Sequence, residues 1–416
     1  ISNINVNLEY YEYLNDIFEL CRHKQKSLNI AKKALLMRVY ITLHHFAPIN
    51  AANECDSVLK TLDKFKLNDD KKFQLSILEL KAHALMNSGL YTDGETLLKE
   101  IQIQWLLDKN ILDNETLFDL YDRLASVYKH FNLSELAKEY NILSMNLAES
   151  LQDSKLQMLA NRSRFKIYLY MDMDSCKTSL QESIALNQIN PSKRIKTDND
   201  LDVCGIEILN NQSNEWDSII KQIITLLDYV EENNFSRAKI HGYFLLAICN
   251  LLKNSKNSIF LAKEYTKKAI DLSTSYGIVG YMWRLNNLNA IIQMRLNDDG
   301  EMIYKSFFSV FEILQSRGLL YIGNRDLCHG NILALSNIGY YLQEHKYESL
   351  FYEKMSLVTY TDKNRYTSTK ESRPENPIHP FLVHQYNQAK NKKVLFTDFQ
   401  PSNLLRDRQT NYIIII

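Results

Sequence analysis

Few residues of this chain have the types and the spacing that catalysis requires. The sequence contains no Gly-rich phosphate-binding loop, no dinucleotide-binding Gly pattern, no zinc-protease His pattern and no serine-hydrolase elbow. His44 and His45 are its one pair of adjacent histidines. Adjacent residues on a helix point about 100° apart, so this pair is a poor metal site.

Two other groupings suggest chemistry only at first sight. Cys328 and His329 are adjacent, but no glycine-shaped oxyanion turn or orienting partner accompanies them. A buried cysteine beside a turn is the better interpretation. Glu231 and Glu232 are interpreted as a charged helix terminus rather than as a catalytic acid pair. We therefore expect no enzyme, no cofactor and no metal ion in this chain.

The composition indicates a helical protein without a strong charge preference. Only 11 of the 416 residues are Gly and 6 are Pro, which disfavours sandwiches, barrels and Gly-rich loops. The chain has 49 basic and 49 acidic side chains, so no overall field steers it toward nucleic acid or an anionic membrane. No apolar run approaches the ~20 residues that cross a bilayer. Nucleic acid and membrane partners are therefore not expected.

The cysteines and the chain ends indicate where the protein works and how much of it is present. The 6 cysteines are scattered without a C-x-x-C pair, which favours a reducing compartment and small buried side chains. The expected location is cytoplasmic, or nuclear if the source is eukaryotic. The sequence opens with Ile1 rather than Met and stops within the apolar run Tyr412–Ile416. We expect a piece of a longer polypeptide.

The elements that position any functional side chain are predicted best from one stretch. Tyr121, Leu124 and Tyr128 recur at helical spacing and form an apolar stripe. Ala125 lies where a second helix must cross, and Ala137 follows at the matching place on that second helix. A short side chain at each place lets the two helix backbones approach closely. The stretch therefore predicts a helical hairpin.

Approximate copies of this hairpin recur along the chain. The copy before it has Ala82 at the crossing, Gly89 and Tyr91 at the interhelical turn and Gly94 on the second helix. Later copies are centred near Arg164, Ala247, Asn289 and Gly339. Their spacing of about 40 to 50 residues exceeds the roughly 34 of a compact repeat. Long helices and a degenerate array are indicated.

This pattern resembles the first-helix signature of the tetratricopeptide repeat (TPR), W-x2-L-G-x2-Y, with Tyr121 in place of Trp and Ala125 in place of Gly. The resemblance implies an all-α fold, an α-solenoid of degenerate TPR-like helical hairpins with a short C-terminal tail that contains strands. Irregular long-helix arrays of this kind resemble the sensor regions of bacterial signal-transducing NTPases of the STAND class, anti-phage members included. In that class an upstream module hydrolyses ATP.

The pattern divides the chain into five expected parts. These are N-terminal helices over residues 1–70, TPR-like repeats over 71–186, a polar loop over 187–214, TPR-like repeats over 215–360, and a Pro-containing linker with a strand-rich tail over 361–416. The polar loop is expected because Lys193, Arg194 and Lys196 are interpreted as solvated charges. Val394–Thr397 and Tyr412–Ile415 are predicted strands that should pack on the last repeats or on a partner.

The functional surface of a TPR array is usually its concave groove, which the first helix of each repeat lines. The family register gives a candidate partner-binding groove, to which Arg284 is added because it adjoins Trp283 and because Trp and Arg are favoured interface anchors. It consists of Asp122, Ser126, Lys129, Asn161, Tyr168, His241, Trp283, Arg284, Asn286, Gln293, Asn337 and Tyr340. Two of these have a second interpretation as inter-repeat packing, namely Trp283 and Tyr340, and Arg284 has one as a brace for the following helix.

The residue types in the groove indicate what it binds. Family members that clamp a C-terminal carboxylate use a Lys and two Asn, whereas Asp122 occupies the Lys position here and Ser126 replaces an Asn. A receptor for chaperone tails is therefore disfavoured. The Asn, Gln, Tyr and His side chains suit a peptide backbone or a polar protein surface, because such groups form adaptable hydrogen bonds.

These observations favour a non-catalytic protein-protein interaction module. The leading hypothesis is a helical-repeat sensor that binds a protein or peptide ligand through its concave face and couples this binding to another domain or subunit. One alternative is a constitutive scaffold subunit of a multiprotein complex. Another is a peptide-responsive transcription regulator, which would need a helix-turn-helix before Ile1.

Overall fold

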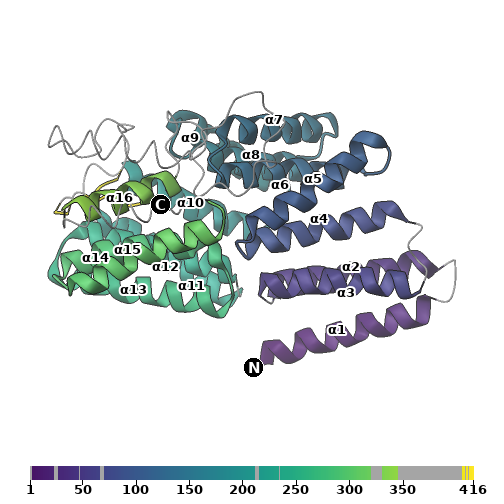
Figure 1. The fold of residues 1–416 in the computed structure, drawn as a ribbon, viewed down its shortest axis with the longest axis horizontal. Helices are drawn as coiled ribbons and strands as arrows, with labels where there is room; N and C mark the ends of the chain where they lie inside the picture. The colour runs from purple at the N-terminus through teal and green to yellow at the C-terminus, as the bar shows by residue number, and fades with distance from the viewer. Residues whose placement is uncertain are drawn as a thin grey trace. The chain divides into compact units, whose positions relative to one another are not determined.

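The computed structural model describes residues 2–22, 27–45, 47–65, 70–210, 215–233, 235–319, 330–344, 405–407, 409–410 and 412–416. Within these ranges the chain is built from α-helices joined by short turns (Figure 1). The first nine helices are α1 (Ser2–Cys21), α2 (Leu28–His45), α3 (Pro48–Lys64), α4 (Lys71–Asn87), α5 (Tyr91–Leu107), α6 (Asn114–His130), α7 (Ser134–Ser150), α8 (Ser154–Tyr168) and α9 (Met173–Ile189). The remaining ones are α10 (Lys193–Asn210), α11 (Trp216–Glu232), α12 (Ser236–Lys253), α13 (Lys256–Ser275), α14 (Met282–Arg295), α15 (Gly300–Ser316) and α16 (Gly330–Glu344), with a 3-10 turn at Val279–Tyr281.

Helices that follow one another in the sequence pack against one another in space. The close partners include α4 with α5, α8 with α9, α11 with α12 and α14 with α15. The predicted all-α helical-repeat fold is confirmed. Extended structure among the described residues amounts to one antiparallel bridge, between Arg406 and Ile413. The predicted strand Val394–Thr397 lies outside the described residues.

The chain forms two compact units. Unit 1 consists of Ile1–Val127 and Ser273–Gly280, and unit 2 consists of Tyr128–Leu272 and Tyr281–Ile416. The division falls within α6, not at either end of the stretch 187–214 that was expected to separate two sets of repeats. The two units are considered separately below.

The predicted polar loop over 187–214 is wrong for most of its length, because α10 occupies Lys193–Asn210. Leu201, Cys204 and Ile208 are buried along this helix. On its exposed side Lys196 forms an ion pair of 2.7 Å with Asp200 at the i, i+4 spacing. The charges that suggested a loop are thus the solvated face of an amphipathic helix.

The turns within the helical hairpins share one backbone device. Gly89 has φ of 79°, and its N–H donates to the Met86 carbonyl at 2.9 Å, as predicted for the turn between α4 and α5. Asn132, Asn254 and Asn297 occupy the corresponding turns with φ of 58°, 61° and 52°. Asn tolerates this left-handed region better than other non-Gly residues. The same spacing separates Gly89 from Asn132 and Asn254 from Asn297, which supports a repeat register in both units.

The helices of a hairpin cross at small residues, as the sequence predicted. Ala82, Ala125 and Ala137 are fully buried. A Cβ atom added to Gly94 on α5 would lie 2.7 Å from the Met86 Cγ and 3.1 Å from the Ala82 carbonyl oxygen. The backbones of α4 and α5 therefore approach as closely as glycine allows.

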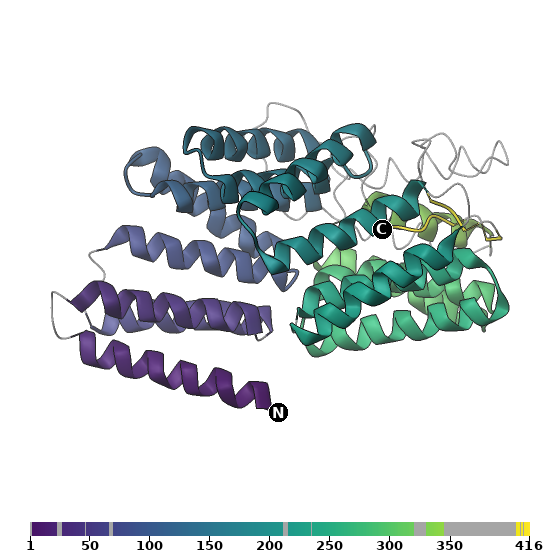
Figure 2. The ribbon, with the colours of Figure 1, turned by 180° about the vertical axis from the view of Figure 1, so that it is seen from behind.

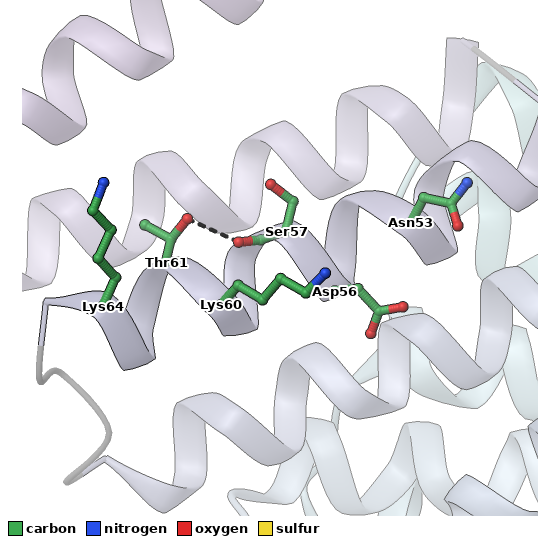
Figure 3. Close-up of a pocket in the computed structure, with 6 residues that line it drawn as sticks. All are labelled: Asn53, Asp56, Ser57, Lys60, Thr61 and Lys64. Carbon is green, nitrogen blue, oxygen red and sulfur yellow. Dashed lines mark hydrogen bonds between the residues drawn. The ribbon is translucent and has the colours of Figure 1, made fainter.

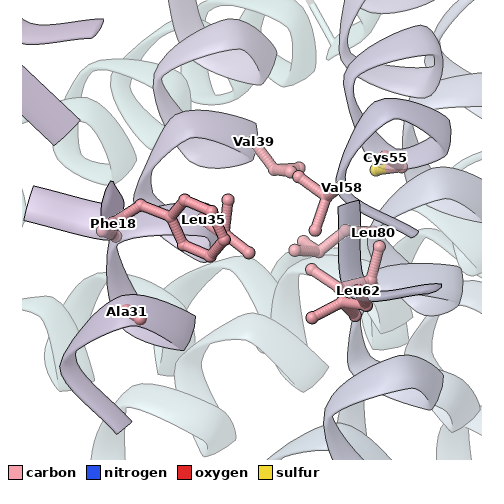
Figure 4. Packing of buried hydrophobic residues seen from close by; sticks show 10 residues of the cluster. Phe18, Ala31, Leu35, Val39, Cys55, Val58, Leu62 and Leu80 are labelled. Atoms are coloured by element: carbon pink, nitrogen blue, oxygen red, sulfur yellow. The ribbon is translucent and has the colours of Figure 1, made fainter. Parts of the chain in front are cut away.

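The N-terminal helices of unit 1 enclose an apolar core. Phe18 of α1, Leu35 and Val39 of α2, Val58 of α3 and Ile77 of α4 belong to one cluster of buried residues (Figure 4). Four consecutive helices thus contribute to the same cluster, which is the packing expected when each hairpin buries its apolar stripe on the next one.

In unit 2 the even-numbered helices from α10 to α16 contact one another in order. The helix α10 contacts α12, α12 contacts α14, and α14 contacts α16. These are the first helices of successive hairpins, the ones that line the groove in TPR arrays. We call the even-helix face the surface of unit 2 to which the last residues of α6 (Tyr128–His130) and the helices α8, α10, α12, α14 and α16 contribute.

Replacing Gly94 by valine should destabilise unit 1 by about 1–3 kcal/mol, because the new side chain overpacks the crossing of α4 and α5. Urea unfolding followed by circular dichroism measures this change. Gly300→Ala is the matched control, because a Cβ at Gly300 meets nothing within 4 Å. Equal stability of Gly94→Val and wild type would contradict the close crossing.

Candidate functional site

The hollow in unit 1 shown in Figure 3 is not a convincing site. Its volume is about 420 Å³, and all six lining residues come from α3: Asn53, Asp56, Ser57, Lys60, Thr61 and Lys64. The Asp56 carboxylate already accepts from Lys81 at 2.6 Å. The Thr61 hydroxyl donates to the Ser57 carbonyl at 2.8 Å. The side chains of one helix face cannot surround a ligand.

The buried cysteines carry no reactive thiolate. Burial raises the pKa of Cys55, Cys176 and Cys204 to about 12. Together with Cys249 they are buried, so the prediction of small apolar side chains is confirmed for these four. Cys328 and His329 lie outside the described residues, as do the side chains of His44 and His45. Glu231 lies near the end of α11 and pairs with Lys239 at 2.8 Å, which confirms a charged helix terminus.

Asp122 and Ser126, the first two predicted groove residues, belong to unit 1. Asp122 is buried and lies 3.5 Å from the Arg123 guanidinium. The same Arg123 is 3.3 Å from Glu79 and 3.9 Å from Asp119. One cation thus stands among three carboxylates. This grouping explains Asp122 as a member of a charged cluster inside unit 1.

The pKa of the Glu79 carboxyl in this cluster differs from its ordinary value. Burial is the main cause that raises the pKa of the Glu79 carboxyl to about 8, with Asp119 adding to it and Arg123 opposing it. An acid whose pKa is higher in the folded state than in the unfolded state stabilises the fold at low pH. That contribution is lost as the pH rises from about 4.5 to about 8.

The variant Glu79→Gln should lack this pH dependence. The stability of wild type minus that of the variant is expected to fall by on the order of 2 kcal/mol between pH 5 and pH 8. Urea unfolding at a series of pH values measures it. Glu100→Gln, at an exposed position of α5, is the control. A difference that stays constant across this window would show that Glu79 is ionised throughout.

Unit 2 carries a group of cations on its even-helix face, which we call the cationic cluster: Lys129 of α6, Lys166 of α8 and Arg284 of α14. The Arg284 guanidinium lies 5.0 Å from the Trp283 ring and 5.9 Å from the Tyr281 ring. Burial, then the charges of Arg284 and Lys166, lower the pKa of Lys129 to about 7. Three helices far apart in the sequence thus bring like charges together.

His241 of α12 lies beside the cationic cluster. Its ring is 5.8 Å from that of Tyr281. Burial is the main cause that lowers the pKa of His241, although Asp202 and Asp198 oppose the change. The imidazole is therefore neutral at physiological pH and can offer both a donor and an acceptor.

No acid of the described residues forms an ion pair with the cationic cluster, although the charges of Asp202 and Asp198 act on Lys166. The acids nearest to it are engaged, because Asp202 lies 3.1 Å and Asp198 3.8 Å from the Arg162 guanidinium. Neither the Lys129 nor the Lys166 ammonium has a hydrogen-bond or ion-pair partner among the described residues. Within the same part of the chain, the buried Arg284 Nε and Trp283 Nε1 atoms also have no acceptor. Unpaired buried donors are costly, so the cluster is suited to an anion.

Of the predicted groove residues, Lys129, His241 and Arg284 come together as described. Trp283 is 4% exposed and lies against α16, since a Cβ at Gly330 would be 2.8 Å from its ring. This geometry supports the interpretation of Trp283 as inter-repeat packing. Tyr340 belongs to α16, but its side chain lies outside the described part.

The other predicted groove residues lie elsewhere in unit 2 or face other groups. Gln293 is turned toward α15, where its Oε1 accepts from the Ser306 hydroxyl at 3.0 Å. Tyr168 packs beside the apolar cluster between α8 and α9. Asn161 donates to the Gln157 carbonyl of its own helix at 3.1 Å, and Asn286 is half-buried.

Asn337 is the predicted residue with the clearest contacts. Its Nδ2 donates to the Ile413 carbonyl at 2.8 Å, and its Oδ1 accepts from the Ile413 N–H at 2.9 Å. Asn287, one residue from the predicted Asn286, donates to the same carbonyl at 3.3 Å. Asn287 lies four residues after the buried Trp283, so it is a polar residue within an apolar helical stripe. This pattern is the signal from which a binding role for Asn287 could have been predicted. Lys166 was missed because an exposed lysine on a helix gives no signal.

The titration of Lys129 tests the cationic cluster directly. In protein with ¹³C-dimethylated lysines, the Lys129 signal should titrate near pH 7 rather than near 10.5. The variant Arg284→Met should move this pKa upward, because it removes one repelling charge, whereas Lys267→Met on α13 should not. The signal is assigned by its absence in Lys129→Arg. Titration of Lys129 together with the bulk lysines would contradict the cluster.

The described fold is that of a helical-repeat protein, and comparison with known proteins adds little to this. No protein-family model matches the chain, and no curated protein is similar to it in sequence. None of the helices in the described ranges is long and apolar enough to cross a membrane.

Several solved structures are similar to the chain. One of them is a Signal Transduction ATPase with Numerous Domains (STAND) protein with a tetratricopeptide repeat sensor from Pyrococcus horikoshii. The identity is 14%, and the TM-score is 0.42. The match covers 76% of this chain and 47% of that chain, so it spans about half of that protein's length. Values this low do not indicate a shared activity.

Proposed function

We propose that this chain is a non-catalytic protein-protein interaction module whose unit 2 binds a protein or peptide ligand through the even-helix face. The observation that carries the proposal is the cationic cluster of Lys129, Lys166 and Arg284, which forms no ion pair with an acid among the described residues. An acidic side chain, or another anionic group of a ligand, would supply the missing charge. Helical-repeat arrays present extended surfaces of this kind to partners.

The electrostatics favour recognition over catalysis. The cationic cluster contains ammonium and guanidinium groups beside a neutral imidazole, and the described residues near it include no nucleophile with a lowered pKa. An anion placed among these groups would raise the pKa of Lys129 toward its ordinary value, and the repulsion between the cations would then be offset. Binding energy of this type is long-ranged and specific for charge.

The finer part of the proposal is that the chain acts as a sensor. Ligand binding on the even-helix face links α6, α8, α12 and α14, so it would bias the arrangement of successive hairpins. A second domain or subunit that contacts the array would receive this change. Such an arrangement corresponds to the sensor role expected from the resemblance to STAND-class proteins, with a cytoplasmic location.

The test is capture of the ligand by the full-length natural protein in its host, measured by quantitative mass spectrometry. Lys166→Glu should reduce recovery at least tenfold, about 1.4 kcal/mol, because it reverses one charge of the cationic cluster. Lys267→Glu is the matched control, since Lys267 is equally an exposed lysine of unit 2 but lies on α13. Equal recovery by both variants would contradict the site. A partner present at fixed stoichiometry in every condition would favour the constitutive scaffold.

A further inference from the structure

The segment Tyr412–Ile416 lies in unit 2 as a peptide ligand would. All five residues are between 1% and 5% exposed. In both views the yellow C-terminal segment runs beside α16 (Figures 1 and 2). Its residues are 68 or more positions beyond the end of α16 at Glu344, so a long stretch of sequence separates the segment from its binding surface.

Side-chain amides hold the backbone of this segment. Asn337 of α16 forms a donor and an acceptor pair with Ile413, at 2.8 Å and 2.9 Å. Asn287 of α14 donates to the same Ile413 carbonyl and accepts from Asn337 at 2.9 Å, which fixes the orientation of both amides. A side-chain amide that offers both a donor and an acceptor makes the two hydrogen bonds that a neighbouring strand would otherwise make. These bonds recognise an extended backbone and not a particular side chain.

Apolar contacts hold the side chains. Tyr412 stacks on Phe307 of α15 with ring centroids 5.4 Å apart. A Cβ at Gly330 would lie 3.1 Å from the Ile415 Cγ2, so the glycine makes room for that residue. At the far end the Tyr170 hydroxyl donates to the Ile416 carbonyl at 2.6 Å. Consecutive isoleucines are buried, so the groove encloses both faces of the peptide.

A tight turn precedes the segment and anchors it. The Asp407 N–H donates to the Tyr412 carbonyl at 3.0 Å, and the Ile414 N–H donates to the Leu405 carbonyl at 2.9 Å. The Asp407 carboxylate is buried against the guanidinium of Arg295 on α14. The backbone hydrogen bonds thus join residues 405–407 to residues 412–414, and the ion pair joins Asp407 to a helix of the repeat array.

We infer that α14, α15, α16 and Tyr170 form a groove for an extended apolar peptide rich in β-branched residues, and that residues 412–416 of this chain, paired with residues 405–407, occupy the groove as an internal ligand. This inference rests on the proposed function and adds the ligand class and the competing occupant. Every contact above could be made equally by a separate chain. An external peptide must compete with a tethered one, which has the advantage of being part of the same chain.

The experiment uses the full chain and a fluorescein-labelled synthetic peptide with the sequence of residues 405–416. In Ile414→Asp the internal segment should leave the groove, because it would bury a carboxylate among apolar groups. This variant is expected to bind the peptide with at least tenfold higher affinity than wild type, measured by fluorescence anisotropy. Ile142→Asp, which changes an exposed isoleucine of unit 2, should behave as wild type. Adding Asn337→Ala to Ile414→Asp should abolish binding.

Two outcomes would overturn the inference. One is a folded, monomeric Ile414→Asp protein that binds the peptide no better than wild type does. The other outcome is measured by hydrogen exchange of the wild type. The inference expects the amides of residues 413–416 to exchange through a smaller opening than those of α14 and α16. Exchange of all these amides in a single unfolding event would make the segment part of the core. Either result would leave the proposed function intact if Lys166→Glu still loses the natural ligand.

Discussion

The close crossing of two helices at small residues is the constraint on which the structure depends. Ala82 and Gly94 let α4 and α5 approach until a single Cβ would collide, and Ala125 and Ala137 are buried in the same way. A hairpin packed this tightly has one apolar stripe left over, which the next hairpin must cover. Stacking follows from this, and so does a row of first helices that contact one another. In unit 2 this row of contacts runs from α10 through α12 and α14 to α16.

Local signals in the sequence were sufficient to predict the hairpins. Gly89 needs a positive φ, Ala125 needs a short side chain, and both requirements are visible in residue types alone. The charged face of α10 misled the prediction, because Lys193, Arg194 and Lys196 outweighed the buried residues that follow them. A helix that buries one narrow stripe and exposes many charges resembles a loop when only its composition is read.

Long-range contacts could not be predicted in this way. The register of the TPR resemblance placed Asn337 in the groove but chose Asn286 over its neighbour Asn287, and an error of one residue turns a helical side chain by about 100°. No local pattern pairs Ile413 with Asn337, because the partners are far apart in the sequence. The cationic cluster is equally invisible, since Lys129, Lys166 and Arg284 converge only when α6, α8 and α14 are stacked.

Equal numbers of acidic and basic residues conceal an uneven distribution of charge. In unit 1, three carboxylates surround Arg123. In the described part of unit 2, three cations gather without an ion-paired anion, and the charges of Asp202 and Asp198 act on one of them, Lys166. The two arrangements have different consequences, because the first can relieve its excess by protonating Glu79, whose pKa is about 8. Loss of a proton from Lys129 gives partial relief in unit 2, but an arginine cannot lose its charge at physiological pH.

The two features of unit 2 meet at Tyr170. Its hydroxyl holds the Ile416 carbonyl at 2.6 Å, and the charge of Arg284 acts on the same phenol, opposing the burial that raises its pKa to about 12. Tyr170 therefore contacts the Ile416 end of the segment and also lies within the electrostatic influence of Arg284, a member of the cationic cluster. A ligand that satisfies both would combine an extended apolar stretch with an anionic group on its C-terminal side. A ligand that contacts only one of these features would bind more weakly. The apolar groove does not select for charge, and in the described part of the chain the cationic cluster does not form hydrogen bonds to an extended backbone.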